Sequence, residues 1–561
     1  MSRPLKRLKV RKGTFSCWEC KHRKIRCEVT TPSSVCLSCQ QRGLSCVSQE
    51  FVIENESGGE SESREHMENN LDRVETLVDQ LLRQRGQQIQ RNKSPNRTML
   101  LNVPQSISNF SLGGYLYSIL PPPATTAVII EHGKFTLMPT PTGRAVGAVQ
   151  LEPPPPSAHP VQFARRLIRL AICLQQSNGP VDEAARYVEI ASQHVTSKDD
   201  LMNSLDGLEA LIMEATYYIN NGNPRVAWLR FRRALAIAQL LGLGMADMTD
   251  RAEGIWFLLL MADRHTSLRL GLPLAVGDNN FSDPRGDALS KLNHIHVVVS
   301  GRIISRNLRM QRQGELEYDE TRKIDYSLKQ VARSLPADWW SFSSLHGLAE
   351  ADVLEKTSIL SAQLTHHYLI VVLHQPYIAQ SLVSPTTNEH VLYSKLVICS
   401  ASREVLLRFL VIRSFHRGGS YFGFEEKACT AMCVLLLAHI DGHRLGQGNS
   451  LEHQRPQDQA LVNNVLNLLE EMHVPNFEVE TLKKLVGIEE QIADGANYAW
   501  MKKSGTGLEL TMPYFGTVCC VLMSSGEQVM HQETSLPLSS DTAGLLDFLD
   551  MLEESPLCEQ T

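Results

Sequence analysis

Six of the thirteen cysteines lie within residues 17–46, and their spacing constrains the chain more than any other feature. They are Cys17, Cys20, Cys27, Cys36, Cys39 and Cys46. The second three repeat the intervals of the first three, because each half is a CxxC pair followed by a third thiol seven residues later. Thiolates favour zinc in tetrahedral sites that need four ligands. Six thiols complete two such sites only if two of them bridge both metals, so the spacing predicts a binuclear cluster with two Zn2+.

Other uses of these thiols fit the sequence less well. A disulfide framework needs an oxidising compartment, and residues 1–16 are basic and lack the apolar core of a secretory signal. A RING- or LIM-like zinc module would want eight Cys or His ligands, and His22 is the only histidine near the cysteines. A mononuclear or purely structural zinc module stays open as the alternative to a module that binds two zincs and DNA.

A basic turn lies between the second and third cysteines. It reads Lys21, His22, Arg23, Lys24, Ile25 and Arg26. A short positively charged helix held between metal ligands can enter a groove of DNA, so this turn is the candidate nucleic-acid contact.

The two cysteine halves resemble the fungal binuclear zinc-cluster transcription factors, also called the Zn2Cys6 type. The resemblance implies that Cys17 and Cys36 bridge the two metals. It also implies that the helix reads a CGG-type triplet through Arg23 and Lys24, with Lys21 and Arg26 towards phosphates. Two positions depart from the family pattern: Pro32 lies four residues before the fourth cysteine instead of two, and Glu28 replaces the usual Asp.

Length and charge separate a small head from a large body. Residues 1–46 carry eleven Lys or Arg and two acidic residues, whereas the whole 561-residue chain has a net charge of −6. A basic head on an acidic body indicates that only the head faces nucleic acid. No apolar run approaches the roughly 18 residues needed to span a bilayer, so no membrane partner is expected.

We predict a mostly all-α chain with disordered linkers and tail. Its expected parts are a basic arm and DNA-binding zinc module over 1–50, a disordered linker over 51–66, a short coiled coil over 67–90, a linker over 91–111, an all-helical regulatory domain over 112–500, and an acidic tail over 501–561. The basic arm, residues 3–12, is a candidate nuclear import signal or phosphate contact; a solvated tail is the alternative.

A heptad pattern follows the first linker. Met67, Leu71, Val74, Val78 and Leu81 recur at alternating intervals of four and three. Two to three heptads make a marginal coiled coil, which a dimer on DNA would stabilise. We therefore expect a homodimer through residues 67–85, with one amphipathic helix packed on the body as the alternative.

From residue 161 onward the apolar residues recur at helical spacing. The expected helices cover 163–174, 180–194, 205–218, 227–243, 251–270, 428–439 and 461–472. Residues 221–224 and Gly271 are expected to end two of them. The segments around Trp228, Trp256 and Pro273 resemble the fungal-specific transcription factor domain, or middle homology region.

Several residues in the body could suggest other chemistry. His366, His367 and His374 could in principle hold a metal, but ordinary helix histidines explain them better. Cys519 and Cys520 are adjacent, and we interpret them as buried apolar side chains. No phosphate-binding glycine loop or dinucleotide fingerprint is present, so we predict that the chain is not an enzyme. No motif identifies a small-molecule effector, although the body could take one.

The C-terminus is acidic, with seven acidic residues and no Lys or Arg over 533–561. Within 541–554, leucines and Phe548 alternate with Asp and Glu. Such a segment can fold as a helix into the groove of a coactivator; a terminal helix docked on the body is the alternative. Together these features predict a nuclear, zinc-dependent activator of RNA polymerase II genes, with a zinc-stabilised interaction scaffold or corepressor as the other reading.

Overall fold

The computed structural model describes two separate compact units, residues 1–104 and 105–561. The described residues are 20, 26–27, 36–42, 109–132, 152–177, 179–245, 248–277, 287–341, 350–383, 388–415, 423–444, 449–472, 476–501 and 507–523. The heptads over 67–85, the basic arm and the acidic segment 541–554 lie outside them, so their predictions stay untested.

The described part of the first unit holds the short helix α2, Leu37–Gln40. The second unit begins with ten helical segments. They are α4 Asn109–Ile119, α5 Pro123–His132, α6 Pro160–Gln176, α7 Val181–Ala191, the π-helical turn η2 Ser192–Thr196, α8 Asp199–Met202, α9 Leu205–Asn220, α10 Pro224–Leu240, α11 Asp250–Leu270 and α12 Ala288–Gln313. It continues with α13 Tyr318–Ser334, the 3-10 turn η4 Ala337–Trp340, α14 Glu350–Val383, α15 Glu389–Phe415, α16 Phe424–His443, the 3-10 turn η6 Glu452–Gln454, α17 Arg455–Glu471 and α18 Asn476–Ala493.

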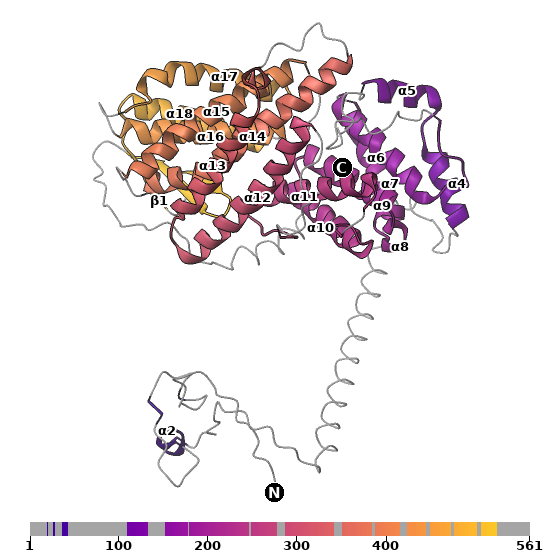
Figure 1. Cartoon of the computed structure of the whole chain (residues 1–561), viewed down its shortest axis with the longest axis horizontal. Helices are drawn as coiled ribbons and strands as arrows, with labels where there is room; N and C mark the ends of the chain where they lie inside the picture. Colours follow the sequence, from indigo (N-terminus) through magenta and orange to yellow (C-terminus); the bar gives the residue numbers. More distant parts are fainter. Residues whose placement is uncertain are drawn as a thin grey trace, which may run out of the picture. The chain divides into compact units, whose positions relative to one another are not determined.

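The helices of the second unit bury two large apolar clusters. One cluster is built mainly by α4–α11 and the other mainly by α12–α18 with the C-terminal strands. Helices α11 and α12 contribute to both: Leu260 and Val297 belong to the first cluster, and Leu268 and Val299 to the second. Figure 1 shows α4–α10 on one side of α11 and α12–α18 on the other. The two helices therefore join the halves of the body.

Local sequence sets where several helices begin and end. The Ser204 hydroxyl accepts a hydrogen bond from the Gly207 amide at 3.0 Å, and the Asp287 carboxylate accepts one from the Ser290 amide at 2.8 Å. Both side chains thus cap backbone amides that have no hydrogen-bond partner within the helix. Gly271 and Gly314 end α11 and α12 with φ of 70° and 79°, a conformation that costs glycine little.

A three-stranded antiparallel sheet closes the second unit. Its strands are β1 Tyr498–Met501, β2 Leu508–Met512 and β3 Gly516–Leu522, in the order β1-β3-β2. Cys519 pairs with Met501 and Glu509, and Cys520 pairs with Trp500 and Leu508. Successive side chains of a strand point to opposite faces, yet both cysteines are buried. Both faces of β3 are therefore covered by protein.

The mostly helical fold class is confirmed. The sheet changes the expected bound of the tail: we expected residues 501–561 to form it, whereas β2, β3 and the turn between them pack into the larger apolar cluster through Leu510, Val518 and Tyr514. The body therefore continues at least to β3. The burial expected for the adjacent cysteines is confirmed. Among the described residues, no helix is both long enough and apolar enough to cross a membrane.

Candidate metal centre and DNA-reading module

The second CxxC pair is organised by helix α2. Cys36 is its N-cap residue, and its carbonyl oxygen accepts hydrogen bonds from the amides of Cys39, at 3.1 Å, and Gln40, at 2.9 Å. Residues three apart in a helical turn project to the same side. The turn thus brings the thiols of Cys36 and Cys39 together, which is the local reason for the CxxC spacing.

Cys20, from the first half, joins this pair. Its Sγ atom lies 3.5 Å from that of Cys36, and the Sγ atoms of Cys20, Cys36 and Cys39 are all within 4.8 Å of one another. A disulfide would place two sulfurs about 2.05 Å apart, much closer than the Sγ atoms of Cys20 and Cys36. Thiolates around one tetrahedral zinc are separated by about 3.8 Å, given a Zn–S distance of about 2.3 Å. The donor type and spacing therefore fit zinc.

Cys36 lies close to cysteines of both halves of the motif. These are Cys20, of the first half, and Cys39, of the second half. All three side chains are buried although the module has few apolar residues. Among the residues of this unit that the structure describes, the buried cluster consists of these cysteines with Cys27 packed against them, and a metal that replaces an apolar core explains such a cluster.

Two further expected residues are described in this unit. Cys27 is half-buried and packs against the three buried cysteines, and the adjacent Arg26 is exposed. An exposed guanidinium next to a metal ligand is well placed for a phosphate. The remaining expected site residues lie outside the described residues: Cys17, Cys46, Lys21, Arg23 and Lys24.

Known proteins agree with this reading of the site. Residues 15–52 match the fungal Zn(2)-Cys(6) binuclear cluster domain. The transcription factor eupR of a Phoma species is 30% identical to this chain, over 65% of this chain and 96% of that protein. The chain belongs to this family of fungal transcription factors.

Other relatives in the family match more of the chain. A dehydrocurvularin biosynthesis regulator of Alternaria cinerariae is 29% identical over 91% of this chain and 77% of its own length. The transcription factor sdnS of Sordaria araneosa is 29% identical over 92% of this chain and 81% of its own length. No solved structure matches the chain. The zinc-cluster domain and the names of these relatives support a DNA-binding transcription regulator.

The body histidines do not meet as a metal site. Among the described residues, the three cysteines above are the one group of three or more ligands close enough to hold an ion. His366 instead shares a hydrogen bond of 3.2 Å with His296. Burial, with Arg408 nearby, lowers the pKa of His366 to about 4, so this ring is neutral at pH 7.

His374 lies in an arrangement that resembles a hydrolytic triad. Its Nδ1 atom is 3.0 Å from the Ser394 hydroxyl, and its Nε2 atom is 3.8 Å from the Asp325 carboxylate. Burial lowers the pKa of His374, although Asp325 opposes this. Ser394 is fully buried, so its hydroxyl is inaccessible to a substrate in this structure, and the three side chains fasten α13, α14 and α15 together.

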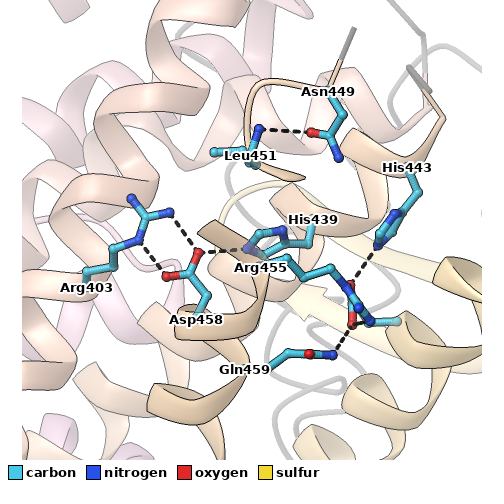
Figure 2. Close-up of polar contacts among 9 residues, drawn as sticks. Arg403, His439, His443, Asn449, Leu451, Arg455, Asp458 and Gln459 are labelled. Atoms are coloured by element: carbon cyan, nitrogen blue, oxygen red, sulfur yellow. Dashed lines mark hydrogen bonds and ion pairs between the residues drawn. The ribbon is translucent and has the colours of Figure 1, made fainter. Parts of the chain in front are cut away.

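Sequence reasoning missed a polar network that joins α15, α16, α17 and α18. Arg403 holds the Asp458 carboxylate with two hydrogen bonds of 2.6 and 2.7 Å, and His439 contacts the same carboxylate at 2.8 Å (Figure 2). A second group repeats the arrangement one turn along α16. There, Arg455 and His443 both contact Glu489 at 2.7 Å.

The one signal of this network in the sequence is the spacing of its histidines. His439 and His443 are four residues apart in a helix whose middle part is largely apolar, so they lie on one face. Nothing local identifies their carboxylate partners, which come from α17 and α18.

Proposed function

We propose that this transcription factor binds DNA as a homodimer at CGG-type half-sites and activates the genes of one metabolic pathway. The observation that carries the proposal is the convergence of Cys20 and Cys39 on Cys36. A thiol that lies close to both halves of a repeated motif is suited to bridge two metals. The match of residues 15–52 to the binuclear cluster domain supports the same arrangement.

The proposed metal ligands are divided between two zincs. Cys17, Cys20, Cys27 and Cys36 hold the first zinc, and Cys36, Cys39, Cys46 and Cys17 hold the second. The zincs are structural: they fold a module that has too little core to fold alone. They also fix the basic turn between Cys20 and Cys27, which is where DNA is read.

In the basic turn, base reading is assigned to Arg23 and Lys24, and phosphate contacts to Lys21 and Arg26. Arginine and lysine recognise the O6 and N7 atoms of guanine in the major groove, which suits a CGG triplet. The exposure of Arg26 supports its role at the backbone. The heptads over 67–85 supply the dimer, which would present two such turns to two half-sites.

The regulatory role is proposed for the rest of the chain. The Alternaria cinerariae relative is named as a regulator of dehydrocurvularin biosynthesis, which supports control of a biosynthetic gene set; the sequence does not identify the pathway. The helical body is proposed to be the middle homology region. The segment 541–554 is proposed to contact a coactivator, and the nucleus is the proposed location.

Binding of the purified, zinc-loaded full chain to DNA tests the proposal. A duplex with two CGG triplets should bind more tightly than a scrambled duplex of equal length, and both affinities should fall as salt rises. Equal affinity for the two duplexes would favour the other reading, a zinc-stabilised interaction scaffold. The molar mass of the complex, from light scattering, tests the dimer.

A further inference from the structure

Helix α13 presents a basic face with an exposed aromatic ring. Tyr326 is 63% exposed, and Arg322, Lys329 and Arg333 lie four residues before it and three and seven residues after it. Such positions share one face of a helix. Arg322 and Arg333 are exposed, whereas Lys329 pairs with Asp325 at 2.8 Å. The exposed Asp319 lies three residues before Arg322 on the same face, so Arg322 and Arg333 leave this face with a small net positive charge.

Helix α15 presents an apolar stripe. Leu392, Leu396 and Leu407 are 41%, 53% and 38% exposed. At about 100° per residue, all three fall within a sector of roughly 60°. Large apolar side chains that share one exposed face indicate a binding surface more often than a scattered set does.

The stripe and the basic face adjoin. The Tyr393 hydroxyl of α15 donates a hydrogen bond to Asp325 of α13 at 2.6 Å, and His390 stacks on Tyr318 with ring centroids 3.6 Å apart. Leu396 follows Tyr393 by three residues, and Tyr326 follows Asp325 by one. We call this combined surface the α13–α15 surface: Arg322, Tyr326, Arg333, Leu392, Leu396 and Leu407.

We propose that the chain's own C-terminal segment, residues 541–554, docks on the α13–α15 surface and is thereby withheld from its coactivator. The segment has the complementary character, because its acidic residues alternate with Leu545, Phe548, Leu549 and Leu552. As a helix it presents these four apolar side chains on one face. Its carboxylates then meet Arg322 and Arg333, and its apolar face meets the leucine stripe.

The chain is long enough to reach. Strand β3 ends at Leu522, which pairs with Tyr498, and the Tyr498 hydroxyl donates to the Ile440 carbonyl of α16 at 3.0 Å. Helix α16 packs directly on α15. Residues 524–540 lie between the body and the segment, and they span up to about 60 Å. A body of this size has a radius of gyration of only about 22 Å.

Photo-cross-linking in the zinc-loaded full chain tests the docking. The benzophenone amino acid p-benzoylphenylalanine replaces Leu396, and after irradiation the cross-linked peptides are identified by mass spectrometry. We expect links to residues 541–554 of the same molecule. The control places the same group at Leu240 of α10, which is 84% exposed, and should give no link to that segment. No link from Leu396 to 541–554, or links only to a second copy, would overturn the docking.

Reporter activity tests whether the docking withholds the segment from its coactivator. This part of the proposal rests on the proposed activator function. Arg322→Glu with Leu396→Asp should raise activation by the full chain several-fold, and Leu240→Asp should leave it unchanged. These are exposed positions, and an unchanged urea midpoint for unfolding of the body shows that the variant is folded. Cross-links without a rise in activity would show that the docking does not withhold the segment from its coactivator. A separate fusion of 535–561 to an unrelated DNA-binding domain shows whether the segment activates at all, so the two failures are distinguishable.

Discussion

The hydroxyl of Tyr514 donates a hydrogen bond to the carbonyl oxygen of Ser267 at 2.8 Å, across 247 positions of the chain. It also donates to the Leu272 carbonyl at 3.1 Å. Tyr514 occupies the turn between β2 and β3 with a φ of 69°, which is unfavourable for a residue other than glycine. The turn fits against the end of α11 so closely that a Cβ atom on Gly271 would lie 2.9 Å from the Tyr514 amide. The C-terminal sheet is thus fastened to the helix that joins both halves of the body.

Tyr514→Phe should destabilise the body by about 1 kcal/mol, because the hydrogen bond from the Tyr514 hydroxyl is lost while the ring packing stays and the Ser267 carbonyl keeps the Leu272 amide as a donor. Urea unfolding followed by circular dichroism measures this. Thr511→Val is the control, since the Thr511–Thr517 hydroxyl pair is exposed and should matter little. Equal midpoints for Tyr514→Phe and the unmodified chain would contradict the role given to the hydroxyl.

Asp458→Asn should cost about 3 kcal/mol, since it leaves Arg403 and His439 without their shared carboxylate. Lys483 is the matched control: its ion pair with Glu470 is exposed, so Lys483→Ala should leave stability unchanged. Both free energies of unfolding come from urea titrations at pH 7. If Asp458→Asn left the free energy of unfolding unchanged, the network of Figure 2 would contribute no stability.

The same network predicts a loss of stability in acid. Burial by itself raises the pKa of Asp458 and of Glu489, but the hydrogen bonds from Arg403 and His439, and from Arg455 and His443, outweigh burial and leave both pKa values below the usual 3.8 and 4.5. Their stabilisation is therefore complete above about pH 5 and is lost as the pH falls through the lowered values. Urea midpoints between pH 6 and pH 3 should fall, and less steeply for Asp458→Asn.

Cys36→Ala should disturb binding of both zincs, because the thiol that we propose as the bridge belongs to each site. Native mass spectrometry should find two zincs in the unmodified chain. Cys433→Ala, in α16 of the body, should retain both. Since the module and the body are separate compact units, the unfolding of the body should not change with Cys36→Ala. A Cys36→Ala chain that keeps one zinc at full occupancy would argue against the shared ligand.

Lys24→Ala and Arg26→Ala should separate base reading from phosphate contact. Lys24→Ala should lose about 1–3 kcal/mol of discrimination between CGG and scrambled duplexes. Arg26→Ala should weaken both duplexes alike and reduce the slope of log K against log salt by about one unit. Fluorescence anisotropy at several salt concentrations measures both effects. An equal loss of affinity for the two duplexes in Lys24→Ala would contradict the assignment of Lys24 to base reading.

The segment 535–561, fused to an unrelated DNA-binding domain, should drive a reporter gene. We propose that its apolar residues make the contact with the coactivator, so Phe548→Ala with Leu549→Ala should abolish activity. Asp547→Asn removes one solvated charge and should only reduce it. A silent fusion, or a fully active double variant, would leave the segment without an activating role.

Sequence patterns predicted the helices well because the period of a helix and the residues that end it are both found within a short stretch of sequence. The stop at residues 221–224 is confirmed by α9 ending at Asn220 and α10 beginning at Pro224. The left-handed Gly271 ends α11 as expected. The zinc module was predictable for a similar reason, since its cysteines recur at short, repeated intervals.

The sheet and the polar network were not predictable because both depend on distant partners. Strand β3 is covered on both faces, so it lacks the alternation that marks a half-exposed strand. Arg403 and Asp458 are 55 positions apart, and neither position differs locally from an ordinary surface charge. Only the packing of α15 on α17 makes them a buried pair.

The strand order β1-β3-β2 has a consequence for how the protein is made. The central strand is the last of the three to leave the ribosome, so β1 and β2 have no partner until residues 516–522 have been synthesised. A chain that stops earlier keeps two open strand edges and lacks the Tyr514 contact with α11, and such edges promote aggregation. Premature stop codons between β1 and β3 should therefore yield insoluble or rapidly degraded chains, even though the zinc module is already complete.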